Sequence, residues 1–291
     1  MRVLVAGAGG LIGSVVASDL TSKGHEVVRL VRREPGPGEV RWDPDGGTID
    51  TGGLEDFDAA VDVASVPWPT RWTSAAKKRI YDNRVGSYRL LAETLAGQER
   101  RPRVLVCASG QGIYPSSDDQ ILTEESPIGS DFLAGLQRDG EAATAAASAA
   151  GIRVVHLRIP SVLGGPNLTT MTRNVRPFGS GRQWWSWVAL DEIPAIVEHV
   201  FNTDRLVGAV NATSPNPVRE AEFSVTLGRI LGRRPGRGVP AFLLRLMMGE
   251  MAEALLLASR RIEPRRLVQT GYQFRYPELE TALRHQLGVA T

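Results

Sequence analysis

Four glycines fall within seven positions near the start of the chain, in the segment GAGGLIG at residues 7–13. A short apolar run precedes this segment and an amphipathic helical pattern follows it, so the glycines should form a tight turn between a strand and a helix. In such a turn, backbone N–H groups and the N-terminus of a helix can together hold a pyrophosphate. The residues expected to contact the pyrophosphate are Gly7, Gly10, Leu11, Ile12 and Gly13.

The second predicted strand ends in a pair of arginines, Arg32 and Arg33. An acidic residue at this place would hold the ribose 2′-hydroxyl of NAD, whereas guanidinium groups pair in bidentate fashion with the 2′-phosphate of NADP. The pattern therefore favours NADP as the cofactor. Two alternatives stay open: Glu34 could turn inward to a ribose hydroxyl, and the arginines could be solvated residues at a strand end.

The elements that would position these residues alternate along the first half of the chain. Short apolar runs predict strands, and longer amphipathic patterns between them predict helices. The predicted strands are 3–6, 26–31, 58–64, 104–108 and 154–157, with a small hairpin at 40–47, and the predicted helices are 11–23, 73–95 and 131–150. This order is typical of an α/β fold with a doubly wound parallel sheet, the Rossmann arrangement.

Beyond Gly164 the alternation of strands and helices fades. We therefore expect a dinucleotide-binding domain over residues 1–163 and a smaller substrate lobe over 164–291, partly packed back on the first domain. Within that lobe, residues 241–258 form an apolar stretch that is interrupted by Arg245, Glu250 and Glu253. The stretch is too short and too charged for a membrane span, so it predicts a buried amphipathic helix.

Charge and composition exclude several classes of protein. The 291 residues carry 34 Lys plus Arg against 32 Asp plus Glu, a net charge of +2, which gives no basic face for nucleic acid. One cysteine and four scattered histidines offer no structural metal site and no disulfide, which favours a reducing cytoplasm. The glycines also interrupt the first apolar run, which is unlike a secretory signal. We expect a cytoplasmic protein with a small-molecule substrate and no membrane partner; the sequence leaves the oligomeric state open.

Several further segments resemble the extended short-chain dehydrogenase/reductases, and in particular an atypical subgroup known as NAD-dependent epimerase/dehydratase-like proteins. The segments that carry the resemblance are the glycine loop, 64–65, 71–73, 83–86, 109–114, 163–164, 179–184 with 186–187, 211–212, 249–251, and 271–272 with 276–277. The resemblance covers essentially the whole chain and implies a Rossmann domain that binds NADP. By position it places these residues beside the cofactor: Val63, Ala64, Ser65, Arg84 and Val162.

The superfamily's Tyr-x-x-x-Lys dyad is missing from this sequence. Its lysine lowers the tyrosine pKa and holds the nicotinamide ribose. Only three lysines occur, the last at Lys78, and none of the five tyrosines has a lysine four residues later. On the predicted helix at 131–150, the resemblance assigns the two places of the dyad to Leu133 and Gln137. Neither side chain can donate a phenolic proton or supply a positive charge.

Two hydroxyl groups remain as candidates for chemistry. Ser109 ends a predicted strand at the place where the superfamily keeps its serine, and Tyr114 follows in a glycine-rich loop. Either could donate a hydrogen bond to a substrate oxygen, although Ser109 could also cap a turn and Tyr114 could anchor the loop by packing. In the segment WWSW, alternation places Trp185 and Trp187 on one side, where they could line a substrate cavity or join the two lobes.

Three functions follow, in decreasing order of support. The first is an NADPH-dependent oxidoreductase that reduces a carbonyl or conjugated alkene of a small molecule, with Ser109, Tyr114 or water supplying the proton. The second is a non-catalytic NADP sensor or scaffold, which the missing dyad would permit. The third is a nucleotide-sugar epimerase, which is disfavoured because reversible oxidation of a sugar hydroxyl needs the missing base.

Overall fold

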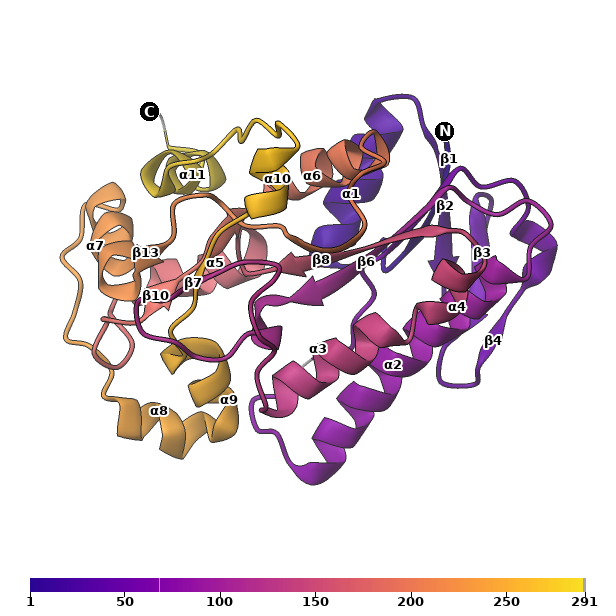
Figure 1. The fold of residues 1–291 in the computed structure, drawn as a ribbon. Helices are drawn as coiled ribbons and strands as arrows, with labels where there is room; N and C mark the ends of the chain where they lie inside the picture. The colour runs from indigo at the N-terminus through magenta and orange to yellow at the C-terminus, as the bar shows by residue number, and fades with distance from the viewer. Residues whose placement is uncertain (68, 290–291) are drawn as a thin grey trace.

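A computed structural model, which describes residues 1–67 and 69–289, has an eight-stranded sheet at its centre (Figure 1). The strand order is β12-β8-β6-β5-β1-β2-β3-β4, and all neighbours are parallel except the terminal pair β3 and β4. The strands are β1 (Arg2–Ala6), β2 (Glu26–Val31), β3 (Glu39–Asp43), β4 (Thr48–Ile49), β5 (Ala59–Asp62), β6 (Val104–Gly110), β8 (Arg153–Ile159) and β12 (Gly208–Asn211). The predicted doubly wound α/β fold is confirmed.

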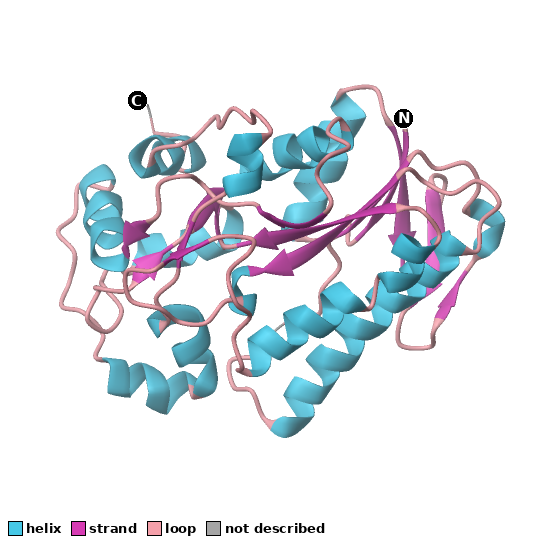
Figure 2. Ribbon diagram, viewed as in Figure 1, coloured by secondary structure: helices cyan, strands magenta, loops and turns pink. Residues whose placement is uncertain are grey.

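Helices cover both faces of this sheet (Figure 2). One face carries α1 (Leu11–Ser22) and α6 (Ile193–Phe201), and the other carries α2 (Ser74–Ala96), α3 (Phe132–Ala142) and α4 (Ala145–Ala149). The apolar run in β1 explains this: Val3 and Val5 pack into the core beneath α1 and α6, whereas Leu4 packs into the core beneath α2. A strand that is buried on both faces needs a continuous apolar sequence, which β1 has.

The predicted helix at 131–150 is divided in the structure. It consists of α3 and α4, with a short break at Ala143 and Thr144. The Thr144 hydroxyl donates to the carbonyl of Glu141 at 2.8 Å, a local side-chain bond that competes with regular helix geometry. The hydroxyl also contacts His156 of β8 at 3.0 Å, which ties the break to the sheet.

Residues after 163 contribute both to the central sheet and to a separate core. β12 forms the edge of the sheet beside β8, and α6 packs against α1. The separate core includes the buried ring of Trp187 and apolar residues of α7 and α11. The other elements are β7 (Ile121–Leu122), β9 (Ser161–Leu163), β10 (Trp184–Trp185), β11 (Trp187–Ala189), β13 (Val218–Arg219), β14 (Arg261–Ile262), α5 (Gly165–Arg173), α7 (Glu220–Ile230), α8 (Ala241–Met248), α9 (Glu250–Ala252), α10 (Arg265–Gln269), α11 (Leu279–Gln286) and short 3₁₀ turns at 51–53, 111–113 and 190–192.

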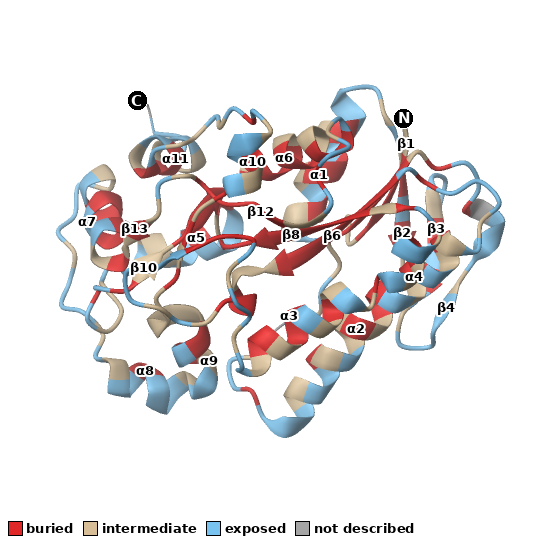
Figure 3. Cartoon of the chain, viewed as in Figure 1, coloured by how far each residue is buried: buried red, intermediate tan, exposed pale blue. Residues whose placement is uncertain are grey.

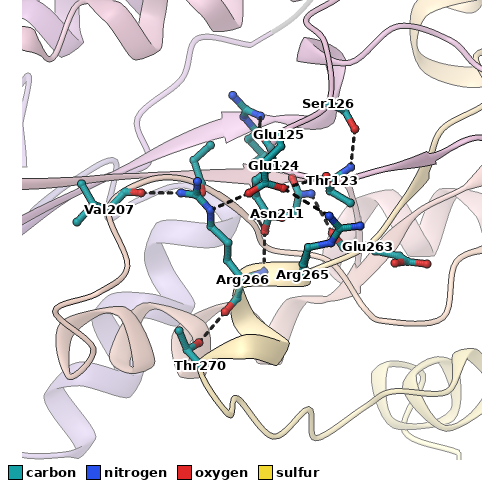
Figure 4. A network of polar contacts seen from close by, with 12 residues as sticks. Thr123, Glu124, Glu125, Ser126, Val207, Asn211, Glu263, Arg265, Arg266 and Thr270 are labelled. Atoms are coloured by element: carbon teal, nitrogen blue, oxygen red, sulfur yellow. Dashed lines mark hydrogen bonds and ion pairs between the residues drawn. The ribbon is translucent and has the colours of Figure 1, made fainter.

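A polar network joins the C-terminal part of the chain to the edge of the sheet (Figure 4). The carboxylate of Glu124 accepts the backbone N–H of Asn211 in β12 at 3.0 Å and that of Arg266 in α10 at 3.2 Å. The Arg266 guanidinium in turn donates to the carbonyls of Val207 and Ala209 at 2.7 and 2.9 Å. These bonds hold β12, α10 and the loop before α3 in one arrangement.

The prediction of one buried helix over 241–258 is wrong. The stretch forms α8, turns at Gly249 with φ of +60°, and continues as α9 and a π-helical turn at Glu253–Leu257. A positive φ suits glycine and breaks the helix at this point. The outer face of α8 is exposed, with Phe242 and Leu246 at 66% and 69% of their full accessibility (Figure 3). Within the described residues, no helix combines the length and apolar character needed to cross a membrane.

Candidate functional site

A cavity of about 1600 Å³ opens at the carboxyl ends of the parallel strands. Its wall includes the segments that follow β1, β2, β5, β6 and β8, at residues 7–12, 32–33, 63–67, 110–112 and 159–162. The chain leaves β1 towards β2 on one side and returns through β5 on the other, so the cavity lies at the point where strand order reverses. Open α/β sheets bind ligands in this crevice.

The glycine loop is held against the loop after β5. Gly7 has φ of +81°, and a Cβ atom there would lie 2.6 Å from the backbone nitrogen of Ala64. A Cβ on Gly13 would lie 2.0 Å from the carbonyl oxygen of Gly7. Both positions therefore require glycine, because any larger residue would displace backbone. Gly13 is buried below the loop, whereas Gly7 reaches the cavity wall.

The rest of the loop leaves space where a pyrophosphate is expected. A Cβ on Gly9 would meet no protein atom within 4 Å, and Gly9 lines the cavity. Gly10 caps α1 through an extended backbone, and the next two residues of the wall, Leu11 and Ile12, are in the first turn of the helix. The N–H groups of a first turn have no acceptor inside the helix, and the helix dipole favours an anion there. The loop thus fits a dinucleotide pyrophosphate.

The two arginines after β2 differ in their surroundings. Both line the cavity, but the Arg33 guanidinium holds the carboxylate of Glu39 through two bonds of 2.7 and 2.6 Å. Within the described residues, Arg32 has no hydrogen-bond or ion-pair partner, which leaves its donors available to a ligand phosphate. Glu34 does not line the cavity; it lies 3.6 Å from Arg41 with 88% of its side chain exposed. The alternative that Glu34 binds a ribose hydroxyl thus has no geometric support.

Most of the other residues expected beside the cofactor also line the cavity. Val63, Ala64, Ser65 and Val162 form part of its wall. Arg84 does not reach the wall in this structure. Its Nη1 donates to the carbonyl of Ala108 at 3.2 Å, and its guanidinium lies 5.1 Å from the ring centroid of Tyr88. The expectation that Arg84 contacts the cofactor is therefore not supported; its sequence neighbour Asn83 is in the wall instead.

A buried acid shapes the loop that packs on Gly7. Asp62 at the end of β5 is fully buried, and its Oδ1 accepts the backbone N–H of Ala64 at 2.9 Å. Burial raises the pKa of Asp62 to about 6, and the hydrogen bond from Ala64 and the charge of Arg84 oppose the rise. Asp62 does not line the cavity, so we assign it a structural role at this loop.

Ser109 and Tyr114 belong to a buried polar network and not to the cavity wall. The Ser109 hydroxyl donates to Glu141 at 2.7 Å, and the Glu141 carboxylate holds Arg158 through bonds of 3.0 and 2.9 Å. Arg158 also donates to the Tyr114 hydroxyl at 2.9 Å, which itself donates to Asn211 at 2.6 Å. Burial raises the pKa of Tyr114 to about 12, so its phenol stays protonated. The prediction that these two hydroxyls meet a substrate has no support in this geometry.

A different polar group does reach the cavity beside these strand ends. Gln137 of α3 lines the wall together with Leu133, one turn earlier on the same helix. Its Oε1 lies 3.4 Å from the Ser109 hydroxyl, and among the described residues its Nε2 donates to no acceptor. Gln137 is therefore a polar residue of the cavity wall with an amide donor that has no protein acceptor, at the place that the resemblance to the superfamily assigns to the dyad's lysine.

The far end of the cavity is apolar and comes from residues after 163. Trp185 lines it and lies against Phe223, with ring centroids 4.1 Å apart and planes inclined by 55°. Trp187 is fully buried in the separate core, where its Nε1 donates to the carbonyl of Asn216 at 3.1 Å. Of the two tryptophans, Trp185 thus lines the cavity and Trp187 packs in the core. The other residues after 163 in the wall are Asn167, Thr170, Met171, Phe178, Glu220, Met248, Met251, Leu255 and Leu256.

Sequence reasoning missed two groups of wall residues. Trp42 and Pro44 lie in the small hairpin after β2, which was predicted without a role. Their place directly after the second predicted strand was the signal that could have put them near the adenosine end, where β3 pairs with β2. Met248 and Met251 were predicted to lie in a buried helix, and no pattern in the sequence assigned a role to Glu220. Only the break at Gly249 turns this segment over the cavity, and the sequence did not reveal that path.

Comparison with known proteins agrees with this architecture. The chain belongs to the NAD dependent epimerase/dehydratase family, whose model matches residues 3–209. A second model, described as a domain of unknown function (DUF1731), matches residues 239–286. The family resemblance expected from the sequence is thus confirmed, and the second match contains the segment of α8 and α9 at the far end of the cavity.

Individual relatives extend over the whole chain. Epimerase family protein Mb2239 of Mycobacterium bovis is 35% identical and covers 97% of this chain and 96% of its own length. The crystal structure of human epimerase family protein SDR39U1 with NADPH is 30% identical, covers 99% of both chains and has a TM-score of 0.89. A nucleoside-diphosphate sugar epimerase from Corynebacterium glutamicum is 34% identical with a TM-score of 0.83; the match covers 99% of this chain and 58% of that one.

Proposed function

We propose that this protein is an NADPH-dependent oxidoreductase that reduces a carbonyl or a conjugated alkene of a small molecule. The observation that carries the proposal is the two-part cavity, in which a dinucleotide site is continuous with an apolar compartment. A site for a single ligand usually occupies roughly 300–1000 Å³. At about 1600 Å³ the cavity has room for a dinucleotide and a second molecule at once.

The residues present fit NADPH. Gly9 and the first turn of α1 leave room and N–H donors for the pyrophosphate, and Arg32 offers a guanidinium for the 2′-phosphate. The similarity to human SDR39U1, whose crystal structure was obtained with NADPH, supports the same cofactor here. When bound, NADPH would supply a hydride for reduction of the substrate.

Gln137 is our candidate for the group that orients and polarises the acceptor. Gln137 lines the cavity, and a hydrogen bond donated by its Nε2 would stabilise negative charge that develops on a substrate oxygen. An amide cannot give up a proton for reduction, so we assign the proton to water that enters from the cavity mouth. The Gln137 Oε1 lies 3.4 Å from the Ser109 hydroxyl, on the side of the helix that meets the end of β6.

One observation favours the alternative of a non-catalytic NADP sensor. The hydroxyls of Ser109 and Tyr114 are engaged in buried hydrogen bonds, so neither is placed to assist turnover. A sensor would bind NADPH tightly, change its affinity for a partner, and oxidise none of the cofactor. The compartment beside the cofactor site favours the enzyme over this alternative, because a sensor has no need for a second ligand cavity.

NADPH oxidation against a panel of quinones, enones and ketones tests the proposal. We expect at least one acceptor to oxidise bound NADPH in single-turnover experiments. Replacement of Gln137 by leucine should lower kcat by roughly ten- to a thousandfold, the effect of one lost transition-state donor, with NADPH affinity nearly unchanged. Tight NADPH binding without oxidation by any acceptor would contradict the oxidoreductase and favour the NADP sensor.

A further inference from the structure

The charges around the cavity are distributed unequally. The basic residues of its described wall are Arg32 and Arg33, and both follow β2 at the adenosine end. The far end has one charged residue, Glu220, and no arginine or lysine in the described part of its wall. A phosphate or carboxylate placed there would lose its hydration without gaining a cationic partner.

Glu220 is itself part of the folded framework. It is 3% exposed, its Oε2 accepts the backbone N–H of Phe178 at 3.0 Å, and its Oε1 accepts the hydroxyl of Ser224 at 3.0 Å. Burial raises the pKa of Glu220, with the two hydrogen bonds opposing the rise. An ionised carboxylate would repel an anionic ligand, and a neutral carboxyl would offer it no positive charge. Both protonation states therefore disfavour an anion.

The other walls at this end suit a planar apolar molecule. Trp185 and Phe223 present aromatic surfaces, and such rings pack favourably against another ring in offset or edge arrangements. Met248 and Met251 close the compartment from α8 and α9. Methionine side chains adapt their shape and make favourable contacts with aromatic rings.

We propose that the compartment formed by Trp185, Phe223 and Met248 binds an uncharged, largely apolar molecule with a planar conjugated ring, of the quinone or cyclic enone class. The inference rests on the proposed function, since this molecule would be the hydride acceptor beside Gln137. A conjugated carbonyl provides both the electrophilic carbon and an oxygen that can accept a hydrogen bond from the Gln137 amide. Nucleotide sugars, which carry a diphosphate, do not suit this compartment.

Binding can be tested separately from turnover. The probe is 2-methyl-1,4-naphthoquinone, measured by equilibrium dialysis against the protein with and without NADP⁺, which cannot reduce it. UDP-glucose is measured in the same way as the charged competitor. We expect the quinone to bind and UDP-glucose to bind at least roughly tenfold more weakly, a difference of about 1.4 kcal/mol. No binding of the quinone, or tighter binding of UDP-glucose, overturns the proposal.

Adjacent methionines provide a matched pair of variants. Met248 lines the compartment, whereas Met247 is 63% exposed on the outer face of α8. Met248→Lys should weaken quinone binding by roughly tenfold or more, because the ligand would then require burial of a charge. Met247→Lys should leave the affinity unchanged. Trp185→Ala serves as a second variant and should also weaken binding. Quinone affinity that is unaffected by both Met248→Lys and Trp185→Ala contradicts the assignment.

The outcomes separate this inference from the function on which it rests. Quinone binding that depends on Met248 and Trp185, without NADPH oxidation, would leave the ligand class standing and refute the oxidoreductase. Oxidation of NADPH by a small charged ketone, together with no quinone binding, would keep the oxidoreductase and refute the ligand class.

Discussion

The two ends of the cavity differ in which parts of their residues form the wall. At the cofactor end the glycine loop contributes backbone to the wall, and its shape depends on the close approach of Gly7 to Ala64 and of Gly13 to Gly7. At the far end the wall is made of large side chains, among them Trp185 and Met248, on elements that follow residue 163. Glycines packed against backbone, such as Gly7 and Gly13, tolerate almost no substitution, whereas a wall of side chains can change its ligand without change of fold. We infer that the first end fixes the cofactor and the second end determines the substrate.

The largest effect is expected at Gly7, which tests how strictly the cofactor end depends on backbone. A Cβ at this position would lie 2.6 Å from the Ala64 nitrogen, at a φ of +81°. Gly7→Ala should destabilise the protein by about 3 kcal/mol or more and abolish measurable NADPH binding. Denaturant unfolding and fluorescence titration measure both.

Gly9→Ala is the matched control for that variant. Its Cβ would meet no protein atom within 4 Å, so stability should change by less than about 0.5 kcal/mol. NADPH affinity should still fall, because the methyl group would occupy part of the proposed pyrophosphate site. Unchanged stability of Gly7→Ala would contradict the claim that Gly7 supports the loop by packing on Ala64. Unchanged NADPH affinity of Gly9→Ala would contradict the claim that Gly9 contacts the cofactor.

A second test at the cofactor end concerns the buried Asp62 and the pH dependence of the free energy of unfolding. Burial raises the pKa of Asp62 in the folded protein from 3.8 to about 6. The folded state therefore binds the proton more tightly than the unfolded state, and the stabilisation is present below pH 3.8 and lost as the pH rises to about 6. Asp62→Asn avoids this loss, so its advantage over the natural protein should grow through that window by up to about 3 kcal/mol.

Urea unfolding across that pH range measures the advantage. Asp118→Asn, at an exposed position, is the control for the loss of one carboxylate. A constant difference between Asp62→Asn and the natural protein would mean that Asp62 is not a strained buried acid.

Arg32 and Arg33 allow a comparison within the cofactor end itself. Arg32→Ala should weaken NADPH binding by roughly ten- to a hundredfold, the value of a charge-assisted pair, and leave NADH binding almost unchanged. Arg33→Ala should have a smaller effect, because its guanidinium is already held by Glu39. Calorimetric titration of both cofactors measures the difference. Equal affinity of the natural protein for NADPH and NADH would contradict the role of the arginines.

The smallest effect on turnover is expected at Tyr114. Tyr114→Phe removes hydrogen bonds to Arg158 and Asn211, so the free energy of unfolding should fall by about 1–3 kcal/mol while kcat changes little. Chemical unfolding and NADPH oxidation measure the two quantities. A large loss of kcat without loss of stability would restore the phenol as a proton donor.

The sequence predicted the cofactor end far better than the substrate end. The glycine loop and the β1–α1–β2 unit are contiguous, and local patterns there determine both the elements and their function. The substrate end depends on packing between distant segments: Trp185 pairs with Val218, and Met251 reaches the cavity after the chain turns at Gly249. Likewise, the engagement of Ser109 by Glu141 arises from two elements whose approach no local pattern reveals.

The most direct test of the central claim is a single-turnover reaction with NADPH deuterated at C4 of the nicotinamide, with the best acceptor from the panel of quinones, enones and ketones. We expect NADPH oxidation to follow one exponential and to be slower with the deuterated cofactor, because breakage of that C–H bond is the reaction step. Gln137→Leu should slow the same phase further. Saturating NADPH binding without any oxidation, whichever acceptor is present, would contradict the account and leave a protein that binds the cofactor without using it.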